Sequence, residues 1–395
     1  MRILMLSWEY PPLLVGGLGR HVHALSVALA EAGHEVTVLT RGDGATRTEE
    51  RHEKVRIVRS GPDPALPALD KENLVPWVLG LNHALTRSGL GLTGPFDVVH
   101  AHDWLVAHAA ASLTRHTRAP LVVTLHATEA GRHHGLLAND LNRTIHRIES
   151  WTLGMAHRVI VCSAHMRGEA GHLFDVPRSN VEVVPNGVDR ESWRPDATAV
   201  ETARRRYGRG GPLLTYAGRL AREKGVPDLL LATAELRHRH PGLRLVVAGD
   251  GARRAELADE AARLGLGDTV EFAGFLPHPE LAALMGAATA LVVPSIYEPF
   301  GMVALEAAAA GVPRVVAATG GLLEYVTDGK TALTYPPSDV RALTDAIDRL
   351  LARPALARRL SEAASATLGS DFSWLAVARR TAEVYQRVVR DVSAG

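Results

Sequence analysis

Short apolar runs alternate with longer amphipathic stretches along the first half of the chain. The runs are rich in Val, Leu and Ile and occupy residues 2–7, 35–40, 96–102 and 121–127. They are apolar on both faces, which is typical of strands in a parallel sheet covered by helices on both sides. The stretch 17–32 places Leu18, Val22, Leu25 and Leu29 on one face, so it predicts a helix that packs on that sheet.

The second half of the chain repeats this alternation. Its apolar runs occupy residues 213–218, 243–249, 269–274, 290–295 and 312–318. Asn-Gly and two prolines interrupt the pattern at 184–199 and indicate a linker, so we place a domain boundary near residue 190. The pattern predicts two α/β domains, 1–190 and 191–372, each a doubly wound, Rossmann-like parallel sheet, followed by a last helix over 373–391.

Size and composition agree with two globular domains. The chain has 395 residues, of which 46% are hydrophobic and 22% charged, as in ordinary soluble enzymes. The net charge of +1 gives no reason to expect nucleic acid as a partner. Cys162 is the sole cysteine, which excludes an intramolecular disulfide, and no apolar stretch of roughly 18 residues spans a bilayer. We therefore expect a cytoplasmic protein without a transmembrane segment, with association at a membrane surface left open. Both a monomer and a homodimer stay open.

A glycine-rich loop follows the first predicted strand. Gly16, Gly17 and Gly19 precede the helix at 17–32, where backbone N–H groups and the helix N-terminus favour an anionic ligand. Val22 stands where a dinucleotide fingerprint needs its third glycine, so an NAD-dependent oxidoreductase is disfavoured. A tight turn without a ligand remains the alternative.

Two cations follow the first strand of the second half. Gly218, Arg219 and Lys224 stand in the segment TYAGRLAREKG, where a guanidinium and an ammonium can neutralise a diphosphate together. The sequence contains no Asp-x-Asp pair that could hold a divalent ion on a nucleotide, so we expect neither a metal nor another cofactor. Solvated surface charges are the alternative here.

Two glutamates flank the start of another helix. Glu298 and Glu306 stand eight positions apart in EPFGMVALE, directly after the run at 290–295. One carboxylate on the loop leaving a strand and a second about two turns into the next helix can both reach a ligand at the carboxyl edge of the sheet. An unrelated loop acid and helix acid are the plainer interpretation.

Histidines cluster in the first half, in VHAHDW and TLHATEAGRHHG. A metallo-hydrolase with an HxHxDH motif needs Asp and His where this chain has Trp104 and Leu105, so a zinc site of that type is disfavoured. His102 and Asp103 are expected to bond sugar hydroxyls, with Trp104 as an apolar wall. His126 is the histidine that we single out as a functional candidate.

These motifs, in this order, resemble the retaining glycosyltransferases of the GT-B fold. The matching segments are GGLG, VHAHDW, TLHA, VPNGVD, AGRL with EKG, EPFGMVALE and ATGGL, and they extend from residue 1 to about 390. The chain is similar to family 4 and to bacterial glycogen and starch synthases. Within that group it is most similar to actinobacterial α-1,4-glucosyltransferases of glycogen and methylglucose lipopolysaccharide synthesis.

The resemblance implies roles for particular residues. Arg219 and Lys224 are expected to bind the donor diphosphate, Glu298 to lie beside the donor sugar, and His126 to lie against the transferred glucose. The implied donor-binding residues are Gly16, Gly17, Asn186, Gly218, Phe275, Phe300, Gly301, Met302, Glu306, Gly320 and Gly321. The implied acceptor-side residues are Glu9, His102, Asp103 and Trp104.

The resemblance also implies a reaction. Glucose passes from ADP-glucose or UDP-glucose to an α-1,4-glucan or related acceptor with retention of configuration, by a metal-independent front-face displacement. Val15 stands where the ADP-glucose-dependent synthases carry a lysine, so the donor base stays open. The two domains are expected to face each other across a cleft, with the helix at 373–391 crossing back onto the first. A GT-B sugar-nucleotide epimerase and a noncatalytic glucan-binding protein are the alternatives.

Overall fold

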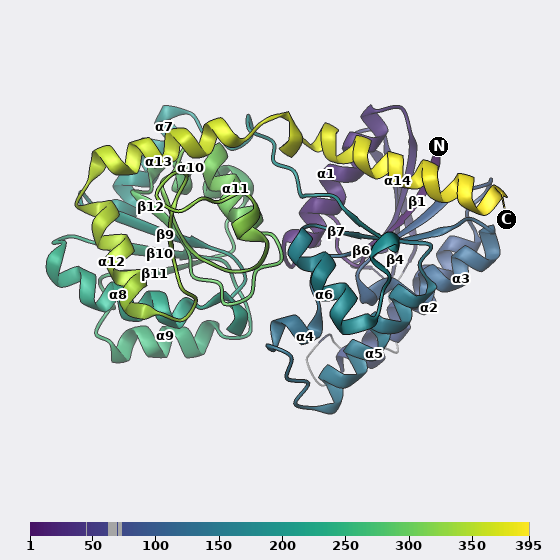
Figure 1. The fold of residues 1–395 in the computed structure, drawn as a ribbon, viewed down its shortest axis with the longest axis horizontal. Helices are drawn as coiled ribbons and strands as arrows, with labels where there is room; N and C mark the ends of the chain where they lie inside the picture. Colours follow the sequence, from purple (N-terminus) through teal and green to yellow (C-terminus); the bar gives the residue numbers. More distant parts are fainter. Residues whose placement is uncertain (45, 62–68, 70–72, 395) are drawn as a thin grey trace. The chain divides into compact units, whose positions relative to one another are not determined.

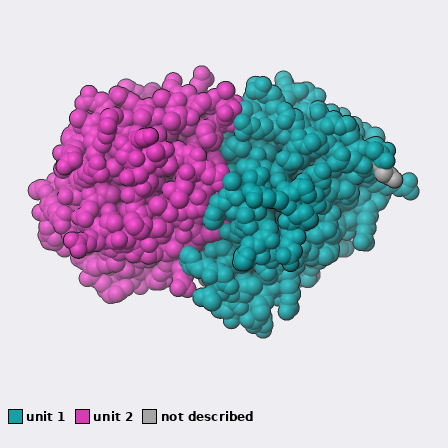
Figure 2. Space-filling view, in the orientation of Figure 1, with its two compact units in different colours: residues 1–187, 374–395 teal, residues 188–373 magenta. Residues whose placement is uncertain are grey.

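The computed structural model describes residues 1–44, 46–61, 69 and 73–394, which form two compact units. Unit 1 comprises Met1–Gly187 together with Trp374–Gly395, and unit 2 comprises Val188–Ser373 (Figure 2). The chain therefore leaves unit 1 once and returns to it for its last helix. None of the described helices is both long enough and apolar enough to cross a bilayer.

Unit 1 is built on an eight-stranded sheet with the strand order β3-β4-β2-β1-β5-β6-β7-β8. Every neighbouring pair is parallel except β3 with β4. The strands are β1 (Arg2–Leu6), β2 (Glu35–Arg41), β3 (Thr48–His52), β4 (Val55–Ser60), β5 (Val98–His102), β6 (Leu121–Leu125), β7 (Arg158–Val161) and β8 (Val181–Val183). The helices are α1 (Gly17–Glu31), α2 (Leu74–Leu90), α3 (Ala107–Thr117), α4 (Glu129–Arg132), α5 (Asp140–Met155), α6 (Ala164–Phe174) and α14 (Trp374–Ala394), with short 3₁₀ turns η1 (Trp104–Val106) and η2 (Arg178–Asn180).

The last helix, α14, belongs to the core of unit 1. It packs against α1 (Figure 1). Its Val377, Val384 and Val388 are buried with the apolar side chains of α1 and of the central strands. On the other side of the sheet, α2 contacts β2 and β4, while α3 contacts β5 and β6. Both faces of the sheet are thus covered, as the doubly apolar strands require.

Unit 2 contains a six-stranded parallel sheet with the order β11-β10-β9-β12-β13-β14. The strands are β9 (Leu213–Ala217), β10 (Arg244–Ala248), β11 (Val270–Gly274), β12 (Ala290–Val293), β13 (Arg314–Ala317) and β14 (Leu333–Tyr335). The helices are α7 (Ala197–Ala203), α8 (Val226–Arg239), α9 (Arg254–Arg263), α10 (His278–Ala287), α11 (Met302–Ala309), α12 (Val340–Leu351) and α13 (Pro354–Thr367), with the π-helical turn η3 (Arg204–Gly208) and the 3₁₀ turns η4 (Arg222–Lys224), η5 (Gly320–Glu324) and η6 (Ser370–Phe372).

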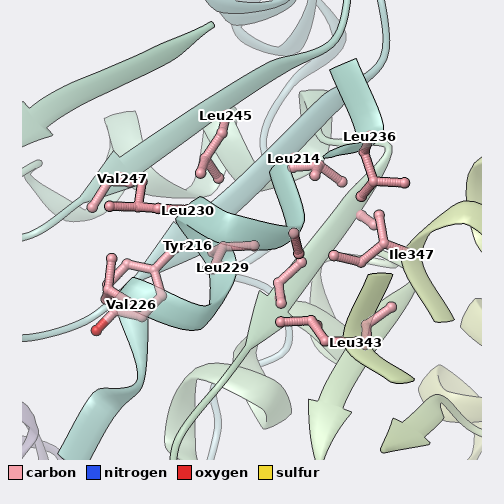
Figure 3. Close-up of a cluster of buried hydrophobic side chains, with 14 of the residues drawn as sticks. Leu214, Tyr216, Val226, Leu229, Leu230, Leu236, Leu245, Val247, Leu343 and Ile347 are labelled. Carbon is pink, nitrogen blue, oxygen red and sulfur yellow. The ribbon is translucent and has the colours of Figure 1, made fainter. Parts of the chain in front are cut away.

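One face of the unit 2 sheet packs on α8 and α12. Leu214, Leu245 and Val247 from the strands meet Leu229 and Leu230 of α8, and Leu343 and Ile347 of α12, in one buried cluster (Figure 3). From β11 at one edge to β14 at the other, the strands of this sheet follow the doubly wound order 3-2-1-4-5-6. Unit 1 has the same order over β4-β2-β1-β5-β6-β7. The predicted fold class, two Rossmann-like parallel-sheet domains, is confirmed.

Candidate active site

The strand order of unit 2 reverses between β9 and β12, and ligands of such sheets bind at the carboxyl ends of the strands at this point. The loop after β9 runs into η4, and the loop after β12 leads to α11. Backbone N–H groups of Ile296 and Tyr297 donate to the carbonyl oxygen of Glu223, at 2.8 and 3.3 Å. The two loops that carry the predicted donor-binding residues are therefore held together by the main chain.

Lys224 and Glu298 meet at this edge. Nζ of Lys224 lies 2.7 Å from Oε2 of Glu298, and the hydroxyl of Ser295 donates to the same oxygen at 2.9 Å. Glu298 and Ser295 are buried, whereas the Lys224 side chain is half-buried. The structure thus brings together two predicted catalytic residues from separate loops, and it adds Ser295, which the sequence analysis did not single out.

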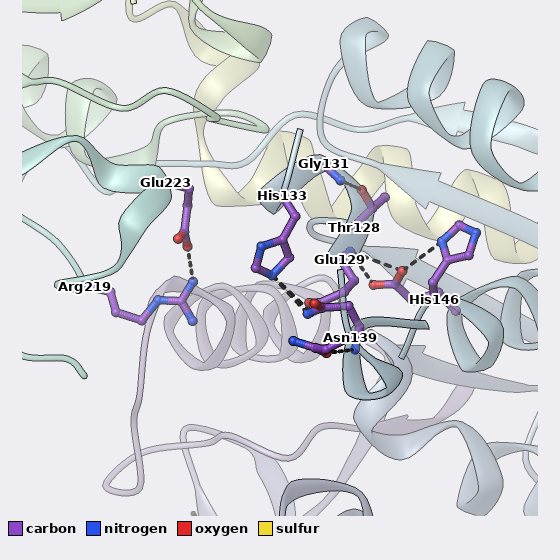
Figure 4. A network of polar contacts seen from close by, with 10 residues as sticks. Thr128, Glu129, Gly131, His133, Asn139, His146, Arg219 and Glu223 are labelled. Atoms are coloured by element: carbon purple, nitrogen blue, oxygen red, sulfur yellow. Dashed lines mark hydrogen bonds and ion pairs between the residues drawn. The ribbon is translucent and has the colours of Figure 1, made fainter. Parts of the chain in front are cut away.

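Arg219 forms a second ion pair at the same edge. Its guanidinium lies 2.7 Å from Oε1 of Glu223 (Figure 4), and the Tyr216 hydroxyl donates to the Arg219 carbonyl at 2.8 Å. Glu223 is buried, so it is not one of the solvated charges that the alternative interpretation of this loop assumed. Its carboxylate orients Arg219, and its carbonyl anchors the loop after β12.

Two of the predicted glycines shape the loop of Glu298. The N–H of Gly321 donates to the Glu298 carbonyl at 3.0 Å. Gly320 has φ +54°, and a Cβ there would collide with the same carbonyl oxygen. A side chain at either position cannot fit without moving the backbone of Glu298 or Pro299. These glycines act first on the shape of the loop, and their predicted contact with the donor stays a prediction.

The remaining predicted donor residues of unit 2 lie on or near α11. Glu306 is buried in this helix, and Met302 is its first residue. The Phe300 ring lies 5.2 Å from that of Tyr325, whose hydroxyl donates to the Gly301 carbonyl at 2.6 Å. Two further predicted residues lie on other segments: Gly218 directly follows β9, and Phe275 follows β11 with 67% of its surface exposed.

In unit 1, Glu9 holds the glycine-rich loop. Its Oε2 accepts hydrogen bonds from the N–H groups of Val15 and Gly16, at 2.7 and 2.9 Å, and the residue is buried. Gly17 begins α1 immediately afterwards. Glu9 was expected to face the acceptor and Gly16 the donor. In the structure the Glu9 carboxylate binds the backbone of Gly16, which favours a supporting role for Glu9.

Four histidines of unit 1 lie against one another. His100 and His102 are on β5, His126 follows β6, and His21 on α1 joins them, with ring centroids 4.7 Å from His126. Nδ1 of His102 lies 3.0 Å from Nε2 of His126, and Oδ1 of Asp103 accepts a hydrogen bond from the backbone N–H of His126 at 2.7 Å. His102 and Asp103 are buried and help to position His126, and their expected contact with a sugar stays a prediction. Trp104 is half-buried in η1.

Asn186 also joins this cluster. It was predicted to contact the donor, but it is buried in unit 1, where its Oδ1 lies 2.8 Å from Nδ1 of His21. His21 itself was not singled out in the sequence, because a histidine one turn into an amphipathic helix is ordinarily a packing residue. Its position directly behind the glycine-rich loop is the signal that could have identified it.

Burial fixes the charge state of these groups. It lowers the pKa of His126, which the nearby Arg132 lowers further, to about 3. The pKa values of His21 and His102 also fall well below the ordinary range, chiefly through burial. Burial raises the pKa of Asp103 to about 7. At neutral pH the histidines are therefore neutral hydrogen-bonding groups, and His126 cannot act as a charged acid.

The segment after His126 is anchored by the carboxyl groups of Glu149 and Glu169. Thr128 caps α4 by accepting from the Gly131 N–H at 2.8 Å (Figure 4). Its hydroxyl donates to Glu169 of α6 at 2.6 Å. The Glu129 N–H donates to Glu149 of α5 at 2.9 Å (Figure 4), and burial raises the pKa of Glu149 to about 9. This network fixes the backbone that follows His126. Glu149 and Glu169 were not identified from the sequence.

Comparison with known proteins places this architecture in a family. The family described as Glycosyl transferases group 1 matches residues 200–367, and Glycosyltransferase Family 4 matches residues 15–192. The chain is 44% identical to a glycogen synthase of Mycobacterium tuberculosis, over 98% of this chain and 94% of that protein. It is 36% identical to a D-inositol 3-phosphate glycosyltransferase of Frankia alni, over 95% of each.

The chain belongs to the family 4 glycosyltransferases. Among solved structures, sucrose-phosphate synthase from Thermosynechococcus elongatus matches this glycosyltransferase with a TM-score of 0.85 and 28% identity, covering 99% of this chain and 100% of that one. The catalytic domain of starch synthase IV from Arabidopsis thaliana matches with a TM-score of 0.76 at 18% identity and so shows the fold alone. The predicted enzyme class and GT-B fold are confirmed, while the roles of single residues stay predictions.

Proposed function

We propose that this glycosyltransferase moves glucose from a nucleoside-diphosphate glucose to an α-1,4-glucan or a related acceptor, with retention of configuration and without a metal ion. The observation that carries the proposal is the 2.7 Å contact between Lys224 and Glu298. These residues follow β9 and β12, the two strands that flank the reversal of strand order, where a nucleotide-binding sheet receives its ligand.

In this proposal the cations of unit 2 bind the donor diphosphate. Arg219 and Lys224 are each held by one carboxylate, Glu223 and Glu298, which fixes their positions before the donor arrives. Negative charge grows on the departing diphosphate as the glycosidic bond breaks, and preorganised cations stabilise that charge most. No separate metal ion is needed for this step. Glu306, buried in α11, is assigned to the donor ribose.

The acceptor hydroxyl attacks from the side that the diphosphate leaves, and a phosphate oxygen accepts its proton. His126 is assigned to the transferred sugar. Because its pKa is about 3, it is a neutral hydrogen-bonding group throughout the physiological range and takes no part as an imidazolium. The contribution of the protein is then positioning and electrostatic stabilisation, not covalent catalysis.

The relatives support glucose as the transferred sugar and a glucan as the acceptor. The protein from Mycobacterium tuberculosis that is 44% identical bears the name glycogen synthase. The relative from Frankia alni, at 36% identity, is named for D-inositol 3-phosphate and makes a phosphorylated polyol the second acceptor to test. Val15 lacks the positive charge that the ADP-glucose-dependent synthases place in this loop, so ADP-glucose and UDP-glucose are both candidate donors.

The test offers ADP-, UDP- and GDP-glucose in turn, with glycogen, maltooligosaccharides, glucose 1-phosphate and inositol 3-phosphate as acceptors. Release of nucleoside diphosphate and product length are measured, with Glu298→Ala as the blank and the anomeric configuration read by proton NMR. Acceptor-dependent release with an α-linked product in excess chelator supports the proposal. An isomerised sugar nucleotide without acceptor indicates an epimerase, and glucan binding without release indicates a noncatalytic protein. Either outcome overturns the proposal.

A further inference from the structure

Three histidines of unit 1 bring ring nitrogens close together. They come from different elements: His21 from α1, His102 from the end of β5, and His126 from the segment after β6. One ring nitrogen of each lies within 4.8 Å of those of the other two. His21 and His102 are almost completely buried, and His126 is half-buried, so the group is reached from the side of His126.

The hydrogen bonding of His21 determines which of its nitrogens is free. Nδ1 lies 2.8 Å from Oδ1 of Asn186, an oxygen that only accepts, so the ring proton is on Nδ1. Nε2 then carries a lone pair, and this buried atom has no hydrogen-bond partner among the described residues. A bare nitrogen on one side and an N–H bonded to an acceptor on the other is the arrangement of histidines that ligate metals.

His102 and His126 are already at a suitable separation. Their Nδ1 and Nε2 atoms are 3.0 Å apart and share one proton, while Nε2 of His102 is buried without a partner. Two nitrogens bound to one tetrahedral Zn²⁺ at about 2.0–2.1 Å are roughly 3.3 Å apart. An ion can therefore replace the shared proton if that proton moves to the outer nitrogen of the ring that carries it, so that each ring holds its single proton on the outer side. Both rings stay neutral, and no proton has to be released.

His100 shows what a purely structural histidine in this cluster looks like. Its Nδ1 lies 2.7 Å from the Tyr385 hydroxyl and its Nε2 lies 2.7 Å from the Thr124 hydroxyl, so both nitrogens are used. A second group of potential ligands, His23, His52 and Glu53, is more exposed, and His23 is already paired with Glu53 at 2.9 Å. Neither His100 nor the second group has a buried ring nitrogen that lacks a hydrogen-bond partner.

We propose that His21, His102 and His126 bind one divalent transition-metal ion such as Zn²⁺, with a fourth position open towards the exposed side of His126. Imidazole nitrogens prefer Zn²⁺, Co²⁺ and Ni²⁺, whereas Mg²⁺ prefers oxygen, so the site differs from the magnesium sites that hold nucleotides. The occupied site withdraws His126 from the sugar and inhibits transfer. This last step rests on the proposed function, whereas metal binding does not.

The test titrates chelator-treated, full-length protein with Co²⁺ and records the visible absorption of the four-coordinate ion. We expect one strong Co²⁺ site per chain, from which Zn²⁺ displaces the Co²⁺. His21→Gln and His126→Gln, with folding checked by circular dichroism, should each lower the Co²⁺ affinity at least tenfold. His52→Ala, which disrupts the second group, should leave the spectrum and the affinity unchanged.

The readouts separate this inference from the proposed function. If the folded His21→Gln and His126→Gln proteins keep the wild-type affinity, or if wild-type protein binds Co²⁺ only as a six-coordinate ion, the site does not exist, whatever the enzyme transfers. If Co²⁺ binds as expected and transfer is measurable, Zn²⁺ should abolish turnover and a chelator should restore it. Full turnover in the Zn²⁺-loaded protein would overturn the inhibitory role alone.

Discussion

Lys224 and Glu298 stand 74 positions apart in the chain, yet their charged atoms lie 2.7 Å from each other at the carboxyl edge of the unit 2 sheet. The ammonium is thereby held over the end of β9 before any ligand binds. Glu298 also accepts from Ser295, so removal of the lysine does not leave the buried carboxylate without a hydrogen bond. This makes Lys224 a residue whose replacement can report on chemistry more than on folding.

Replacing Lys224 or Arg219 by Ala should lower kcat/KM for transfer by about 100-fold or more, the usual loss when one group that stabilises a developing anion is removed. The matched control is Arg222→Ala, because Arg222 is an exposed cation in η4, the 3₁₀ turn that also contains Lys224. Steady-state release of nucleoside diphosphate measures the effect. Near-normal kcat/KM in both variants, with an unchanged circular dichroism spectrum, would show that these cations do not act on the donor.

Gly320→Ala should destabilise unit 2 and impair transfer together. The new Cβ meets the Glu298 carbonyl, and the residue has φ +54°. Gly329→Ala is the control, since Gly329 has φ +66° but open space around it. Backbone strain alone costs about 1 kcal/mol, whereas strain with a collision should cost on the order of 3 kcal/mol. Thermal unfolding of the two variants compares them, and equal losses would show that the close approach is unimportant.

Tyr385→Phe should weaken the attachment of α14 within unit 1. The variant removes the hydroxyl that lies 2.7 Å from Nδ1 of buried His100. A buried polar atom that loses its partner costs about 1–3 kcal/mol. Urea unfolding followed by tryptophan fluorescence measures the loss. Leu375→Ala, at an exposed position on the same helix, should change stability by less than about 0.5 kcal/mol, and a larger effect there than at Tyr385 contradicts the assignment.

Glu149 should make stability fall as pH rises. Its pKa in the folded protein is about 9, against about 4.3 in an unfolded chain. Between these values the folded state keeps a proton that the unfolded state has released, so the free energy of unfolding decreases with pH, by at most about 1.4 kcal/mol per unit. Below the unfolded-state pKa and above the folded-state pKa, Glu149 does not change the free energy of unfolding with pH.

Glu149→Gln keeps an oxygen for the Glu129 N–H and has no proton to lose. The variant should therefore lack this part of the slope and gain stability relative to wild type between pH 5 and 8. Chemical denaturation at several pH values tests the prediction. Parallel pH profiles for the two proteins would mean that Glu149 ionises normally.

The sequence revealed the fold where the apolar pattern was strong. Strands such as β1 and β9 consist mostly of apolar residues, and α1 has four apolar residues on one face. It did not reveal β4, where Arg56 and Arg59 interrupt the run, or β8, which is only three residues long. Short or partly polar strands are recognised through their neighbours in the sheet, and a linear pattern does not contain those neighbours.

The candidate site shows the same division. Lys224 and Glu298 could be proposed from the sequence because each lies in a distinctive loop just after a strand. Their pairing could not, since it depends on β9 and β12 being neighbours in the sheet. The contact of His100 with Tyr385, across 285 positions, and the approach of His21 to His126 likewise require the folded topology.

Unit 2 is an insertion into unit 1, since the chain leaves unit 1 after Gly187 and re-enters it at Trp374. The N–H of Val188 donates to the carbonyl of Phe372 at 2.8 Å, so the two ends of the inserted unit lie side by side. During translation the ribosome therefore synthesises most of unit 1 first. The core of unit 1 is incomplete until α14, the last helix to be synthesised, packs into it. Unit 2 can be complete while the nascent unit 1 still exposes the apolar surface of α1.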